Sequence, residues 1–185
     1  MSGPAFQYRR PARVLHWTMA VLVIAMIGAG VLMVQPDLDR SLQNGLFVFH
    51  KNVGVLLLFL LILRARYRWR HPPAALPDDV PGWQRQAAGL SHVSLYTLLL
   101  AMPIAGYIRV KAGGFPIETL DWLGIPSLVP RSDAVAETAK VVHYFSGIAL
   151  GGFIVLHIGA AAYHGILRRD GVFSRMWPPF ARRHG

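Results

Sequence analysis

Four long apolar segments place the strongest constraint on the fold of this chain, and they span residues 14–34, 46–65, 91–110 and 141–167. A helix of about 20 apolar residues crosses a bilayer, and in lipid its backbone polar groups must be paired within the helix. We therefore expect an all-α protein, a bundle of four transmembrane helices formed by residues 1–185 as a single domain. The hydrophobic share of 54% agrees with an integral membrane protein.

The first apolar segment also has the order of a signal peptide, because Arg9, Arg10 and Arg13 precede it and small residues lie toward its end. It is longer than the roughly 7–15 apolar residues of a signal peptide, so we favour a retained span. The absence of cysteine excludes disulfides, thiolate-bound zinc, iron–sulfur clusters and covalently attached haem. Histidine, present 8 times, is left as the main candidate metal ligand.

The distribution of charge predicts the orientation of the four helices. The side that carries neither terminus has six basic and six acidic residues, so the net charge of +10 lies wholly on the side of the termini. Because positively charged loops stay in the cytoplasm, we expect both termini to be cytoplasmic. The basic residues flank apolar spans and do not alternate with aromatic residues on one face, so we expect membrane lipid and not nucleic acid as a partner.

Histidines recur at matched depths in the apolar segments. His143, His157 and His164 are separated by 14 and 7 residues, which places them on one face of the fourth helix. His143 lies toward the outer end of that helix, level with His50 of the second, and His157 lies ~21 Å further inward, level with His16 of the first. Each pair could clamp one haem iron between neighbouring helices, so the pattern predicts two b-type haems.

Two other readings compete with haem. Intramembrane histidines also serve as hydrogen-bonded packing residues. A zinc site would gather its ligands around one point, whereas these histidines lie at two levels.

The residues one turn after the four candidate ligands are all small, as a flat porphyrin pressed against a helix requires. They are Ala20, Gly54, Gly147 and Ala161. Large residues follow His92 and His164 at that spacing, so we assign these two histidines to haem propionates or to a quinone at the cytoplasmic end. The alternative for both is an interfacial histidine bonded to headgroups or water.

Three cations close the outer end of the bundle. Lys51 follows a candidate ligand directly, and Arg109 and Lys111 end the third apolar segment. Together they could form a positive mouth above the outer haem that gathers a small anion or an acidic partner. Each taken singly is also explained as a side chain that extends to the membrane interface.

The sequence resembles the bacterial cytochrome b561 family, small four-helix di-haem proteins of the inner membrane. The resemblance rests on RVLHWTMAVLVI, FVFHKNVGVLLLFLLILRARYR, GLSHVSLYTLLLAMPIAGY and VVHYFSGIALGGFIVLHIGAAAYHGILRRDGVFSRMWP, which together include all four apolar segments. It implies that His16, His50, His143 and His157 are axial haem ligands. It also implies electron transfer between the periplasmic face and the quinone pool, and one member of the family is a superoxide oxidase that reduces ubiquinone.

The resulting hypothesis is a di-haem cytochrome that takes electrons from superoxide or another periplasmic donor and reduces quinone near His92 and His164. The second hypothesis is a membrane anchor and electron-transfer subunit for a partner dehydrogenase or other redox protein. A third is a carrier of protons or metal ions lined by histidines.

Overall fold

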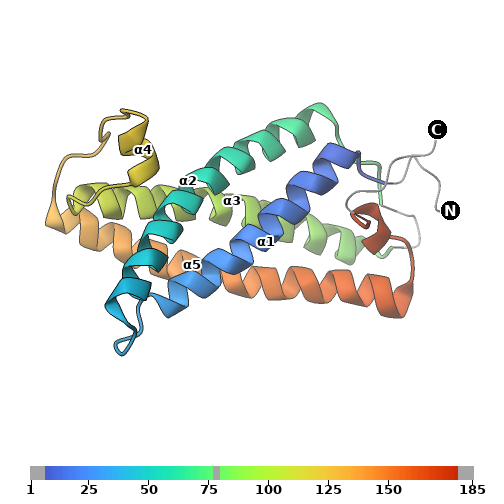
Figure 1. Ribbon diagram of the computed structural model, residues 1–185. Coiled ribbons are helices and arrows are strands. Elements are labelled where there is room, and N and C mark those ends of the chain that lie inside the picture. The colour runs from blue at the N-terminus through green and yellow to red at the C-terminus, as the bar shows by residue number, and fades with distance from the viewer. Residues whose placement is uncertain (1–6, 77–79, 179–185) are drawn as a thin grey trace.

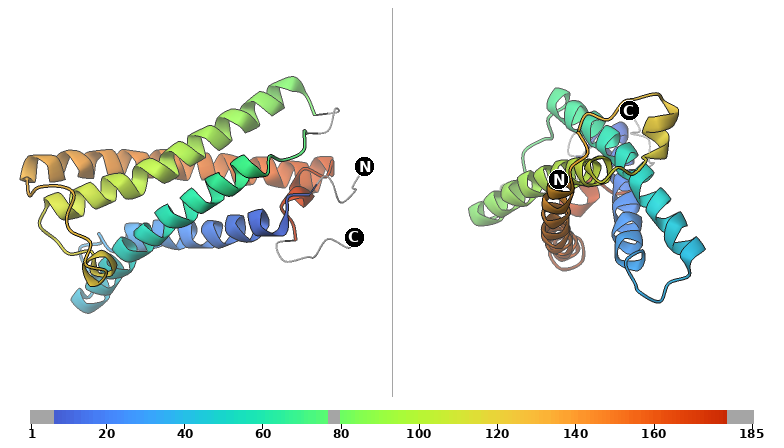
Figure 2. Two further views of the ribbon diagram at one scale, coloured as in Figure 1. Left: turned by 90° about the horizontal axis from the view of Figure 1, so that it is seen from above. Right: turned by 90° about the vertical axis from the view of Figure 1, so that its left-hand side faces the viewer.

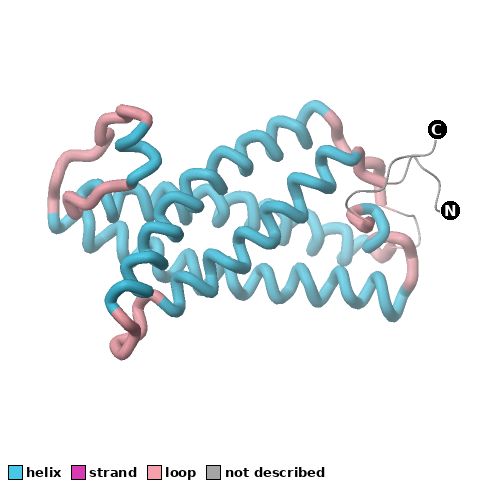
Figure 3. Tube along the Cα trace, viewed as in Figure 1, coloured by secondary structure: helices cyan, strands magenta, loops and turns pink. Residues whose placement is uncertain are grey.

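The structure is a computed structural model that describes residues 7–76 and 80–178. Within these ranges the regular structure is helical, and no strand is present (Figures 1 and 3). Four of the helices described are long and apolar enough to cross a membrane. They are α1 (Arg10–Leu32), α2 (Arg40–Arg70), α3 (Gly82–Ala112) and α5 (Asp133–Ala162). The predicted all-α bundle with four spans is confirmed.

The helices are longer than the apolar segments that predicted them. Helix α2 continues to Arg70, where residue 65 was expected, and α3 begins at Gly82, where residue 91 was expected. Hydropathy marks only the part of a helix that lies in lipid, whereas helical hydrogen bonds continue into water. Basic residues in the last turn of α2 also suit the negative end of its dipole.

The bundle is made of two helix pairs, because α1 packs mainly against α2 and α3 packs mainly against α5. Figure 2 shows the two pairs side by side, with α2 also in contact with α3. Met19 and Val23 of α1 meet Leu57 and Leu61 of α2 in the buried cluster at the centre. Large apolar side chains elsewhere on the helices face outward, as expected for helices surrounded by lipid.

The two ends of the bundle differ. A loop that contains the short helix α4 (Glu118–Trp122) covers one end, at the left of Figure 1. This helix was not expected from the sequence. At the other end, α5 continues as a π-helical turn, η1 (Tyr163–Arg168), and a 3₁₀ turn, η2 (Phe173–Arg175), follows.

The segment after η2 lies against α1. The indole Nε1 of Trp17 donates a hydrogen bond of 2.9 Å to the Met176 carbonyl, and the Tyr8 amide donates one of 3.0 Å to the Arg175 carbonyl. These bonds explain why the last described segment returns to the start of the first helix.

Candidate functional site

The outer pair of histidines joins α2 and α5. The ring centroids of His50 and His143 lie 6.0 Å apart, and their planes are 70° from parallel. His143 Nδ1 donates a hydrogen bond of 3.0 Å to the Met102 carbonyl of α3, which fixes the tautomer and leaves Nε2 without its proton. The Nδ1 atom of His50 is buried and has no hydrogen-bond partner within the described residues.

Glycines on the neighbouring helices make room for both rings. A Cβ atom on Gly30 of α1 would lie 3.2 Å from Cε1 of His50. One on Gly106 of α3 would lie 3.3 Å from both Cε1 and Nδ1 of His143. The two rings therefore rest directly on glycine backbone, and any larger residue would press on them.

The inner group contains three histidines. His16 of α1 and His157 of α5 have ring centroids 6.1 Å apart, with planes 77° from parallel. His92 of α3 is also close, 5.7 Å from the ring of His157. The pairing by depth predicted from the sequence is the pairing that the structure contains, and His92 joins the inner pair.

The spacing of both pairs fits one iron atom between two imidazoles. Bonds from a metal to a histidine nitrogen are ~2 Å long, and a ring nitrogen lies ~1 Å from the ring centroid, so two axial imidazoles have centroids ~6 Å apart. Both ring planes then contain the bond axis, which allows any angle between them. Among residues 7–76 and 80–178, no group of three histidines or carboxylates has the geometry of a metal site. The paired arrangement thus fits haem.

Two of the small residues next to the candidate ligands lie close to flexible methionine side chains. A Cβ on Gly54 would lie 3.7 Å from the terminal methyl of Met26, and one on Gly147 would lie 3.5 Å from that of Met102. Ala20 and Ala161 are half-buried. Contact of these four residues with a porphyrin stays a prediction.

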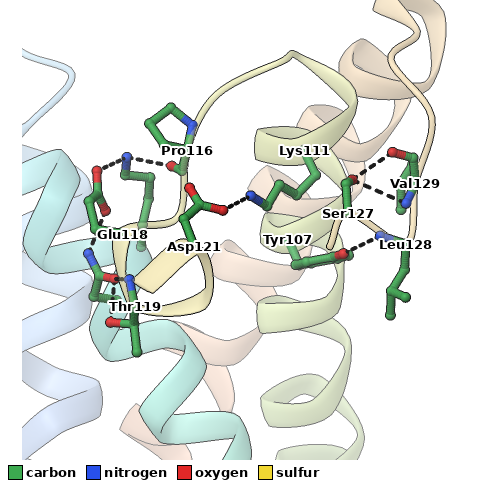
Figure 4. A network of polar contacts seen from close by, with 11 residues as sticks. Tyr107, Lys111, Pro116, Glu118, Thr119, Asp121, Ser127, Leu128 and Val129 are labelled. Atoms are coloured by element: carbon green, nitrogen blue, oxygen red, sulfur yellow. Dashed lines mark hydrogen bonds and ion pairs between the residues drawn. The ribbon is translucent and has the colours of Figure 1, made fainter. Parts of the chain in front are cut away.

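The outer lysines are engaged with the loop that carries α4. Lys51 Nζ donates to Glu118 Oε1 at 2.7 Å and to the Pro116 carbonyl at 2.8 Å, and Lys111 forms an ion pair of 2.5 Å with Asp121 (Figure 4). Asn52, next to Lys51, donates to Glu118 Oε2 at 2.6 Å. These bonds hold the loop over the end of the bundle.

The carboxylates of this network offset the charge of the two lysines. Burial alone raises the pKa of Glu118, but hydrogen bonds from Lys51 and Asn52 outweigh it and leave the pKa below its ordinary value. Glu118 is therefore ionised at neutral pH. Arg109 lies within electrostatic range of both outer histidines and forms no ion pair within the described residues. The gathering of anions by Lys51, Arg109 and Lys111 stays a prediction.

His164 belongs to a different arrangement from His92. In the η1 turn its Nδ1 donates a hydrogen bond of 2.5 Å to Asp170, whose side chain is only 3% exposed. Arg168 Nε donates to the same carboxylate oxygen at 3.2 Å. Burial raises the pKa of Asp170, but the bonds from His164 and the Val172 amide outweigh it, so the pKa lies below its ordinary value. The structure therefore separates the two predicted quinone histidines.

Several contributors to the site were not found from the sequence. Gly30, Gly106 and Met102 act from helices that carry no outer ligand, and nothing in their local sequence marks them. Arg64 could have been noticed, because it follows His50 by the 14 residues that separate His143 from His157.

Membrane-spanning helices that bring histidine rings together in facing pairs are typical of membrane-bound b-type cytochromes. The family model for prokaryotic cytochrome b561 matches residues 7–179. Cytochrome b561 homolog 2 of Escherichia coli (strain K12) is 30% identical over 164 residues, which cover 87% of this chain and 86% of that protein. The probable superoxide oxidase CybB of Yersinia pestis is 27% identical over 171 residues, which cover 89% and 92% of the two chains.

The chain belongs to the prokaryotic cytochrome b561 family. It is accordingly a multi-pass bacterial membrane protein that binds b-type haem and transfers electrons. Membrane lipid surrounds it, and its partners are of the quinone or redox class.

Proposed function

We propose that the protein is a di-haem cytochrome of the bacterial inner membrane that oxidises superoxide at the periplasmic side and reduces ubiquinone. The observation that carries the proposal is the presence of two facing histidine pairs, 6.0 and 6.1 Å apart. A relative that covers nearly the whole chain is named as a probable superoxide oxidase, which supports the choice of donor.

In this proposal His50 and His143 hold the outer haem, and His16 and His157 hold the inner one. Bound haem supplies one-electron exchange at a metal that stays ligated in both oxidation states. The bond from His143 Nδ1 to the Met102 carbonyl orients the ring and leaves Nε2 as the nitrogen that would bind the haem iron. Ala20, Gly54, Gly147 and Ala161 are the positions where the porphyrin would pack.

The orientation follows from charge. The cytoplasmic side is the end of the bundle that carries the basic last turn of α2 and the start of α1, so both termini are cytoplasmic. The end covered by α4 then faces the periplasm (Figure 1). His50 and His143 lie in the first halves of α2 and α5, the halves nearer to this end. A superoxide anion would arrive at the outer end, where Arg109 offers a positive charge.

The stoichiometry requires two superoxide anions for each quinone. Each superoxide loses one electron and becomes O₂, and the quinone gains two electrons and two protons. We assign the quinone to the inner end, where His92, beside His157, and His164, in the η1 turn, are two separate candidate contacts. His164 donates a hydrogen bond from Nδ1–H to Asp170, so Nε2 of the neutral ring is an acceptor and could bond to the hydroxyl group of the reduced quinone.

The decisive experiment mixes the purified, oxidised protein rapidly with superoxide and follows the haem absorbance, with and without ubiquinone. We expect haem reduction that is faster than the dismutation of superoxide, followed by reoxidation only when ubiquinone is present. Haem that stays oxidised until the superoxide has dismutated would exclude superoxide as the donor.

Single substitutions test the ligands. We expect His50→Ala or His143→Ala to remove one haem and His16→Ala or His157→Ala to remove the other, as measured by haem content and reduced spectra. His71→Ala is the control, because His71 lies outside both groups and bonds to the Tyr67 carbonyl. Loss of the same haem from substitutions in both pairs would contradict the assignment.

A second candidate function is an electron-transfer subunit for a periplasmic dehydrogenase. The observation in its favour is the apolar surface of the loop around α4, where Trp122 is 84% and Leu128 is 79% exposed. Trp122 would also suit the membrane interface. Purification from the native membrane separates these readings, because a subunit would bring a dehydrogenase with it and a complete oxidase would not.

A further inference from the structure

Arg64 occupies a position among the inner histidines. Helices α2 and α5 both run from the α4 end of the bundle toward the opposite end (Figure 2). Arg64 follows His50 by the same 14 residues that separate His143 from His157, so it lies on the face and at the level of the inner group. Its charge acts on His16, His92 and His157. Each of the four long helices thus contributes one nitrogen-containing side chain there.

Among the described residues, no carboxylate is paired with Arg64. Its Nη1 donates a hydrogen bond of 3.0 Å to the Ala12 carbonyl of α1, which draws the guanidinium inward between the helices. Neither Arg64 nor Arg68 forms an ion pair within the described residues. Helices α1, α2 and α3 contain no Asp or Glu at all, and Asp170 is engaged with His164.

A buried hydroxyl group lies beside this cation. Tyr96 of α3 follows His92 by one turn, and its hydroxyl lies against the Arg64 guanidinium. That hydroxyl is buried, and apart from this approach to Arg64 no described residue meets it with good hydrogen-bond geometry. Arg64, Arg68 and Tyr96 also line one small cavity. A half-buried cation and a buried hydroxyl that share a cavity form a set of donors suited to an anion with several acceptor oxygens.

We propose that Arg64 binds a propionate carboxylate of the inner haem, with Arg68 and the Tyr96 hydroxyl as further donors. The inference rests on the proposed haem at His16 and His157. A porphyrin held there carries two carboxylates at its edge, and a guanidinium is the side chain that binds a carboxylate through two parallel hydrogen bonds. A lipid phosphate would instead meet the exposed Arg66 and Arg70 of the same helix first.

The potential of the inner haem is the first test. Reduction adds one negative charge, so removing a nearby cation favours the oxidised state. For Arg64→Gln we expect the equilibrium constant for reduction of the inner haem to fall about tenfold, which is ~59 mV for a one-electron couple. The outer haem should be unaffected. Arg66→Gln, an exposed residue on the same helix, is the matched control and should change neither haem.

A chemical exchange provides the second test. The apoprotein is reconstituted with haem or with its dimethyl ester, in which both carboxylates are blocked, and binding at the inner site is compared. Wild type and Arg66→Gln should bind haem at least tenfold more tightly than the ester. Arg64→Gln should discriminate much less, and Arg64→Lys, which keeps the charge, should recover part of the difference.

Equal discrimination by Arg64→Gln and the wild type would overturn the role of Arg64, and so would an unchanged inner potential. If Arg64→Gln does not retain the inner haem, Arg64→Lys tests whether the positive charge at this position is what holds it. Retention of that haem by the lysine variant supports the charge role, and its loss refutes it. A wild-type protein that binds no haem at His16 and His157 would instead refute the proposed function, so the two failures are distinguishable.

Discussion

Replacement of Gly106 by alanine tests whether the glycine on α3 is there to admit the ring of His143. The new methyl group would lie 3.3 Å from both Cε1 and Nδ1 of that ring. The ring cannot easily move aside, because its Nδ1 is bonded to the Met102 carbonyl at 3.0 Å. The strain would therefore fall on the outer haem site.

Two opposing effects set the size of the change. Alanine in a helix interior is favoured over glycine by ~1 kcal/mol. Excess volume in a packed site lowers the free energy of unfolding by ~1–3 kcal/mol, and here the added methyl group would displace His143. Gly152→Ala on α5 provides the reference, since a Cβ there has nothing within 4 Å. Gly152→Ala should gain the ~1 kcal/mol by which alanine is favoured in a helix, without any steric contact with a neighbouring side chain.

We expect Gly106→Ala to be ~2 kcal/mol less stable than Gly152→Ala, corresponding to roughly 30-fold weaker retention of the outer haem. The measurements are haem content by alkaline pyridine spectra and thermal unfolding in detergent, with the inner haem as an internal standard. A Gly106→Ala protein with two haems and an unfolding temperature equal to that of Gly152→Ala would refute the packing argument.

Two further predictions concern the ends of the bundle. Asp170→Asn should destabilise the protein by ~2 kcal/mol, because it removes a buried charge-assisted hydrogen bond to His164. The pKa of Asp170 in the folded protein lies below its ordinary value, so the full stabilisation is present above the ordinary carboxyl pKa. It is lost as pH falls through the lowered pKa of Asp170. The unfolding temperatures of wild type and variant, measured by thermal unfolding, should therefore converge at acid pH. Glu118→Gln leaves Lys51 without its carboxylate and should raise the rate of haem reduction by superoxide roughly twofold at low salt but not at high salt. A slower or salt-independent rate would show that the charge at the outer end gathers no anions.

The four helices and the pairing of histidines could be predicted because both depend on regular helix geometry. Apolar length identifies a span, and a separation of 14 residues places two side chains on one face at two levels. Loops obey no such periodicity. The short helix α4 and its bonds to Lys51 and Asn52 depend on contacts between residues more than 60 positions apart, for example 66 between Asn52 and Glu118. This explains why the ion pairs of the outer lysines could not be predicted from the sequence.

Contacts between residues of different helices could not be predicted from the sequence either. The sequence marks which residues lie on the histidine face of a helix, but not which residue of the next helix meets them. Gly30 and Gly106 were therefore not anticipated, whereas Gly54 and Gly147, four residues from a ligand on the same helix, were. His92 was placed with His164 by depth, but a ring distance of 5.7 Å puts it with His157.

The two levels of the bundle differ in charge, and this difference predicts the direction of electron flow. At the outer level Lys51 and Lys111 are each paired with a carboxylate, and Arg109 is the described cation whose charge acts on both outer histidines. At the inner level Arg64 and Arg68 have no carboxylate partner within the described residues, and α1 to α3 supply none.

Because positive charge stabilises the reduced form, the inner haem should have the higher potential, and electrons from the periplasmic side should move inward spontaneously. Redox titration of His50→Ala and His16→Ala, each retaining one haem, assigns the potentials. The haem that remains in His16→Ala is the outer one. If its reduction potential is the higher of the two, the charges of the protein do not determine which haem is reduced more easily. Electron transfer toward quinone would then depend on the reoxidation of the inner haem.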